Sequence, residues 1–235
     1  MRSSLVKYNR GMTLVELLVV LSIFAIISMT VAFNYGNYKS TTSTNVLAQN
    51  VALSIREAQG YAMGVKSVSF AGQSVFPGYG VHFSPSQNYR VSGSSKSFVL
   101  FADIPPDDVT PADLEYNFPL NNDDDSICDG TNLGNANECI SLVTISGGDK
   151  IWGVCANTDT FDACDNDVAN ASGSLDILFR RPNPDAKFCY RQDSTDSTSP
   201  CMNNVSAAGI FVQSESDPGV FKKIIVWNTG QISVE

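Results

Sequence analysis

One apolar segment near the N-terminus constrains this chain more than any other feature. Residues 12–33 read MTLVELLVVLSIFAIISMTVAF, and Glu16 carries the only charge among them. Because about 20 helical residues cross the hydrocarbon core of a bilayer, the segment predicts one transmembrane helix. A cleavable secretory signal is the alternative. It is disfavoured because the apolar run is long and no small-x-small cleavage site precedes Asn34.

The residues before the apolar segment are few and basic. Arg2, Lys7 and Arg10 are the only charged side chains in residues 1–11. The positive-inside rule therefore predicts a single-pass protein, with residues 1–11 in the cytoplasm and the body outside, in the periplasm or at the cell surface.

The cysteines also indicate an oxidising compartment. Their even number and the absence of any C-x-x-C pair predict three disulfides rather than buried free thiols or metal ligands. Short loops cost less entropy to close, which favours three sequential pairs although other pairings stay open. These pairs are Cys128–Cys139, Cys155–Cys164 and Cys189–Cys201.

Glu16 needs a physical explanation. A carboxylate at mid-depth in a membrane helix costs about 2.5–3.5 kcal/mol, and less at its position about 6 Å along the helix from Met12. Its side chain could reach the head groups. Alternatively, cleavage before Met12 would create an α-amino group, which a neighbouring subunit could present to Glu16. Such a pair would set the register between helices.

The start of the segment resembles a known family. From Gly11 to Val20 it reads GMTLVELLVV, which resembles the prepilin leader and helix start of type IV pilins and type II secretion pseudopilins. The resemblance implies that a membrane aspartyl peptidase cuts after Gly11, that Met12 is N-methylated and that Glu16 guides assembly. Met12 replaces the usual Phe, and Phe33 stands where many members have a helix-bending Pro, so we expect a straighter helix.

The same resemblance implies a set of partners. They are other pilin or pseudopilin subunits, the prepilin peptidase, the membrane, and a secretion or pilus assembly platform that extracts the subunit into a filament. Removing residues 1–11 takes away three cations and no acid, so the formal net charge goes from −9 to −12. A body this acidic repels phosphate, and we expect no nucleic-acid partner.

Residues 34–66 continue without proline and predict an amphipathic helix extension. Residues 47–64 also resemble minor pseudopilins. Residues 39–45, KSTTSTN, are weak helix formers and are expected to fray or unwind. The apolar face repeats at steps of three and four residues. Its members are Leu47, Val51, Ile55, Ala58, Ala62 and Val65.

Residues 67–235 change to short apolar runs broken by turns, which predict strands. The clearest hairpin is KKIIVWNTGQISVE, in which Gly230 supplies a positive φ. The segments FPGYGVHF, FVLFADI and LDILFRRPNPDA also resemble pilin-like proteins. The predicted fold is α+β, with a long N-terminal helix packed on an antiparallel β-sheet body in one extracytoplasmic domain. The other candidate strands are 67–70, 80–83, 98–102, 140–145, 151–154, 175–179 and 209–213.

Two further possibilities concern ligands and catalysis. Asp162, Asp165 and Asp167 are candidate calcium ligands, but they lack the D-x-D-x-D-G spacing, so a solvated acidic loop without a cofactor is favoured. The chain shows no hydrolase, zincin or P-loop motif. Its only histidine, His82, lies in a strand-like run, and we expect no enzymatic activity.

The predicted function is therefore that of a pilin-like subunit of a type II secretion pseudopilus or a type IV pilus. The large, cysteine-bearing body favours a minor subunit. A pilin for adhesion or DNA uptake is a related alternative. A single-pass anchored binding protein that never polymerises is an alternative from another class.

Overall fold

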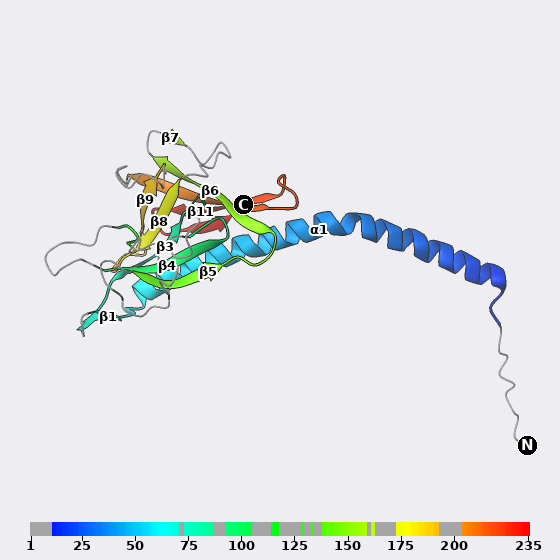
Figure 1. The fold of residues 1–235 in the computed structure, drawn as a ribbon, viewed down its shortest axis with the longest axis horizontal. Coiled ribbons are helices and arrows are strands. Elements are labelled where there is room, and N and C mark those ends of the chain that lie inside the picture. Colours follow the sequence, from blue (N-terminus) through cyan, green and yellow to red (C-terminus); the bar gives the residue numbers. More distant parts are fainter. Residues whose placement is uncertain are drawn as a thin grey trace, which may run out of the picture. The chain divides into compact units, whose positions relative to one another are not determined.

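The computed structural model describes residues 11–70, 73–86, 93–104, 114–117, 128, 133, 138–158, 161–162, 173–192 and 204–235. The chain divides into two compact units, Met1–Lys39 and Ser40–Glu235, which are described separately. Figure 1 shows its helix and strands.

The first unit contains the beginning of helix α1, which spans Leu14–Met63. Its apolar stretch, Leu14–Phe33, has a mean hydropathy of 2.6, and none of its most apolar window is buried within the chain. Large apolar side chains such as Leu14 and Phe24 are 76% and 68% exposed. The segment predicted to cross the membrane is therefore helical, and it is long and apolar enough to do so.

The second unit contains the rest of α1, which packs against the strands. Of the predicted apolar face, all members within the helix are buried, and Val51 and Ile55 have no exposed surface. Val65 is the exception at 44% exposed, because α1 ends at Met63 and Val65 has a positive φ of 57°. The backbone N–H of Lys66 donates to the carbonyl of Tyr61 at 3.2 Å and closes this helix end.

The expectation that residues 39–45 unwind is wrong: α1 is continuous through them. Thr44 is fully buried, and its hydroxyl lies 2.9 Å from the carbonyl O of Ser40 and 3.3 Å from Oδ1 of Asp149. The hydroxyl of Ser40 lies 2.9 Å from that of Ser216. Asp149 and Ser216 are distant in the sequence and pair with hydroxyl groups of the helix. These tertiary contacts therefore override the weak helix propensity of the segment.

Within the described residues, the strands form two five-stranded antiparallel sheets and one small hairpin. The first sheet has the order β5-β4-β3-β8-β9, with bounds Cys139–Thr144, Ser97–Asp103, Gly78–Phe83, Ser174–Phe179 and Ala186–Arg191. The second has the order β12-β11-β10-β6-β7, with bounds Ile232–Val234, Phe221–Trp227, Val205–Ser214, Asp149–Thr158 and Phe161–Asp162. The hairpin pairs β1, Val68–Phe70, with β2, Gln73–Val75.

The α+β prediction is confirmed, with a body of two sheets instead of one. One large hydrophobic cluster joins the buried face of α1 to both sheets. Ala48 and Ala52 are buried beside the predicted stripe, which widens the apolar face of the helix. The large core side chains come from both sheets, and they include Tyr79, Phe83, Phe98, Phe179, Phe188, Ile151, Ile210 and Ile224.

The candidate strands all lie within or overlap observed ones, whereas β2, β7 and β9 have no predicted counterpart. The C-terminal hairpin β11–β12 forms as predicted, and Gly230 has a φ of 81°. A Cβ at this position would lie 2.1 Å from the carbonyl O of Pro184, so only glycine fits.

Candidate functional site

The predicted processing site lies immediately before α1. Gly11, Met12 and Thr13 are not helical, and Leu14 begins the helix. The side-chain Oγ1 of Thr13 accepts a hydrogen bond from the backbone N–H of Glu16 at 3.3 Å. Its carbonyl O accepts one from the N–H of Leu17 at 3.2 Å. Thr13 is therefore the N-cap of α1, and the Gly11–Met12 peptide bond lies outside the helix.

The Thr13 cap was missed in the sequence, although a signal for it exists. Thr-x-x-Glu before an apolar run is the sequence pattern of a capping box, and Thr13 with Glu16 fits it. The structure shows the half of this box in which the Thr side chain accepts from the backbone of Glu16.

Glu16 lies in the first turn of α1. The helix macrodipole places partial positive charge at this end, so a carboxylate here is partly stabilised by the helix itself. Within the described part of the chain, none of the ion pairs includes Glu16. The structure therefore places Gly11, Met12 and Glu16 together at one helix start, as their spacing predicts.

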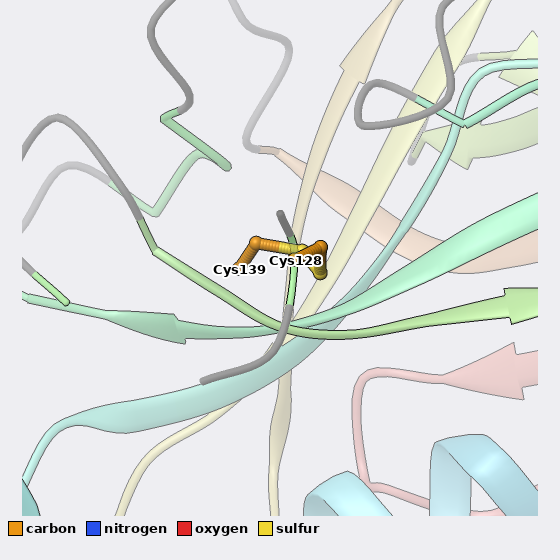
Figure 2. Close-up of a disulfide and its surroundings, with 2 residues drawn as sticks. All are labelled: Cys128 and Cys139. Atoms are coloured by element: carbon orange, nitrogen blue, oxygen red, sulfur yellow. A yellow bond between two sulfur atoms is a disulfide. The ribbon is translucent and has the colours of Figure 1, made fainter. Parts of the chain in front are cut away.

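The body carries a disulfide on one face of the first sheet. Cys128 and Cys139 are bonded, with their Cα atoms 5.3 Å apart, which is the pair expected from its short loop. Figure 2 shows this disulfide at the start of β5. It packs in a second apolar cluster with Val99, Phe101 and Leu178.

Two other cysteines are also disulfide-bonded. They are Cys155 in β6 and Cys189 in β9. Their expected partners, Cys164 and Cys201, lie outside the described residues. Of the candidate calcium ligands, Asp165 and Asp167 lie outside them too. Asp162 is placed only as part of strand β7.

Two carboxylates, one buried and one partly buried, hold residues 114–117 against the first sheet. Glu138 is fully buried, and its two oxygens accept the backbone N–H groups of Ile104 at 2.8 Å and Asn117 at 2.7 Å. Glu115 pairs with Arg191 of β9 at 2.5 Å. No sequence motif marks these residues, because their partners are distant in the chain.

His82 lies in the same region. Its Nδ1 is 2.6 Å from Oδ1 of Asp176, and both side chains are largely buried. The ring of Tyr116 lies 5.0 Å from the imidazole between ring centroids. Burial raises the pKa of Tyr116 above its usual range, and the carboxylates of Glu138 and Asp176 add to the effect. The arrangement joins β3, β8 and residues 114–117.

Comparison with known proteins locates the site at the N-terminus. Residues 6–32 match the prokaryotic N-terminal methylation motif. No curated protein and no solved structure matches the chain. The matched segment contains Gly11, Met12, Glu16 and most of the apolar stretch of α1. The chain therefore carries a type IV pilin-like prepilin motif, which indicates a substrate of prepilin peptidase, and its apolar helix fits a membrane-anchored pilin.

Proposed function

We propose that the chain is a subunit of a type II secretion pseudopilus or a type IV pilus. It is cleaved between Gly11 and Met12 and then assembles through α1. The observation that carries this proposal is the apolar stretch Leu14–Phe33, which is not buried within the chain, together with a carboxylate in its first turn. The matched methylation motif over residues 6–32 supports it.

Glu16 favours assembly over simple anchoring. An anchor that never polymerises gains nothing from a carboxylate in its membrane helix, which only lowers its stability in the bilayer. In a filament, the α-amino group of a neighbouring Met12 would pair with Glu16 in a medium of low dielectric constant. Breaking such a pair leaves an uncompensated charge, so the pair favours one axial register.

The proposed role of the body is structural and not catalytic. The buried pair of His82 with Asp176 supports this reading, because the chain's only imidazole is bonded to a neighbouring strand. The proposed partners are other pilin or pseudopilin subunits and the assembly platform, and the large disulfide-bonded body favours a minor subunit. We propose neither a cofactor nor nucleic acid as a ligand.

The test combines mass spectrometry of the N-terminus with filament assembly in cells that carry a prepilin peptidase. The mature chain is expected to begin at Met12 with one added methyl group. Glu16→Gln keeps the size of the side chain and removes its charge, and it is expected to leave export intact while abolishing incorporation into filaments. Glu57→Gln changes an exposed glutamate in the body part of α1 and serves as the matched control.

Two outcomes would contradict the proposal. A chain that still begins at Met1, or one cut beyond Phe33, would exclude processing by the pilin pathway. Processing at Gly11 with full function of Glu16→Gln would instead support the anchored binding protein.

A further inference from the structure

We propose that Thr13 is a positioning residue for removal of the leader. As the N-cap of α1, it keeps the Gly11–Met12 peptide bond in non-helical backbone, where the peptidase can hydrolyse it. This inference rests on the processing step of the proposed function. It gives Thr13 a role in addition to the roles proposed for Gly11, Met12 and Glu16.

The geometry of the helix start carries the inference. Thr13 makes the cap with both its side chain and its carbonyl, through the N–H groups of Glu16 and Leu17. An N-cap residue has non-helical φ and ψ, so it ends the helix on its N-terminal side. Met12 is 65% exposed, and no heavy atom lies within 4 Å of an ideal Cβ built on Gly11. Among the described residues, nothing therefore covers the scissile bond.

Hydrolysis requires this openness. The oxygen of one water molecule adds to the carbonyl carbon of Gly11, the bond from this carbon to the nitrogen of Met12 breaks, and the nitrogen takes up a proton. The second proton of the water is also transferred to this nitrogen, so the products are the carboxylate of Gly11 and the ammonium group of Met12, which the filament would use. In a helix, the carbonyl O of Gly11 would accept the N–H of Val15, and the helix would shield the carbon. An extended backbone can instead form main-chain hydrogen bonds with the edge strand of a binding partner.

The sequence contains an earlier position at which the helix could begin. The position of the cap therefore decides whether the scissile bond lies inside the helix. Asn9 is the nearest upstream residue whose side chain can cap a helix. A helix that began after Asn9 would contain Arg10, Gly11 and Met12 in its first turn and would enclose the scissile bond. Gly11 opposes this extension through its poor helix propensity, and the Thr13 cap opposes it by defining the later start.

Removing the cap is therefore expected to lower the fraction of substrate in the cleavable conformation. Replacing a capping Thr by a residue that cannot cap shifts such an equilibrium by about five-fold. A smaller competent fraction weakens apparent binding in proportion. We expect Thr13→Val to raise KM, by at most about five-fold, with little change in kcat. Thr13→Ser and Thr13→Asn should behave like the wild type because both side chains cap.

The experiment measures initial rates of leader removal from full-length, detergent-solubilised protein by membranes that contain prepilin peptidase. Thr30→Val is the matched control, because the hydroxyl of Thr30 donates to the carbonyl of Ile27 at 2.8 Å inside the same apolar helix. Rates are normalised to the amount of solubilised full-length substrate, which removes any difference in yield between variants.

The outcomes separate the inference from the function on which it rests. A raised KM for Thr13→Val, rescue by Ser and Asn, and an unchanged Thr30→Val would support the inference. Wild-type rates for Thr13→Val, or a loss shared by Thr13→Ser, would overturn it while leaving processing intact. Failure to cleave the wild type at Gly11–Met12 would overturn both.

Discussion

The carboxylate of Glu138 illustrates what single residues do in the body. Its two oxygens accept backbone N–H groups from residues 34 and 21 positions away, Ile104 and Asn117. A buried carboxylate with several such bonds fixes the segments that donate them, because breaking any bond leaves a charged group poorly solvated. Together with the pair Glu115–Arg191, it fastens residues 114–117 to the first sheet.

The environment of Tyr79 predicts how the free energy of unfolding depends on pH. Burial raises its pKa to about 12, and the neighbouring Tyr61 adds to the shift. Between pH 10 and 12 the folded protein therefore keeps a proton that the unfolded chain has released. The free energy of unfolding should fall as pH rises through this window, and the titration of Tyr79 should add no pH dependence below it. Urea unfolding of the detergent-solubilised protein at pH 8, 9, 10 and 11 measures this dependence.

The variant Tyr79→Phe isolates the contribution of this residue. It loses the hydrogen bond to the carbonyl of Lys66 at 3.0 Å, so its stability at pH 8 should be lower by about 1 kcal/mol. Its further loss between pH 9 and 11 should be smaller than that of the wild type. Tyr38→Phe, at an exposed position of α1, should match the wild type throughout. Equal alkaline losses in Tyr79→Phe and the wild type would contradict the assignment.

At the scale of elements, α1 depends on polar contacts where its intrinsic propensity is lowest. The hydroxyl of Thr44 faces the buried carboxylate of Asp149. Thr44→Val keeps the shape of the side chain and leaves that carboxylate without this donor, so we expect a loss of about 1–2 kcal/mol. Hydrogen exchange of the amides of residues 40–46 should also become faster, since local opening requires less free energy.

Thr42→Val is the matched control for this prediction. Thr42 lies in the same weak segment but is exposed, and valine and threonine have similar helix propensities. It should leave both stability and exchange nearly unchanged. Equal effects of the two substitutions would mean that intrinsic helix propensity alone stabilises the segment, and that its contacts with the rest of the body do not.

The same segment shows how far the sequence predicts the elements. The buried face of α1 and the hairpin at Gly230 follow from local periodicity and turn chemistry, so both were predictable. The continuity of residues 39–45 was not, because Ser216 lies 176 positions from Ser40 and Asp149 lies 105 from Thr44. Strand β9 lacks a regular alternation and is defined by its pairing with β8, which no local pattern shows.

The candidate site follows the same rule. Gly11, Met12 and Glu16 could be predicted because the prepilin motif is a local spacing within one helix start. The cap by Thr13 is equally local, and its Thr-x-x-Glu pattern could have been read. Glu115, Glu138 and the pairing of His82 could not, because tertiary structure brings their partners together.

At the scale of the whole molecule, the division into two units predicts where in the chain an independently folding fragment can begin. The unit Ser40–Glu235 contains its own core, which includes α1 residues Leu47, Val51 and Ile55. Each such buried side chain contributes about 1.5–3 kcal/mol, and together they are comparable to the 5–15 kcal/mol that stabilises a typical domain. The boundary for independent folding should therefore lie before the body part of α1, not at the first strand.

Two fragments test this boundary, both exported behind a cleavable secretion signal so that their disulfides form. The fragment 40–235 should be monomeric without detergent and unfold cooperatively in urea, because the exposed apolar stretch is gone and the core is complete. The fragment 67–235 should aggregate, because Tyr79, Phe98 and other core residues lose the helix that covers them. A monomeric, cooperative 67–235 would show that the sheets form a core without α1. Aggregation of 40–235 would show that the first unit is needed for folding as well as for membrane insertion.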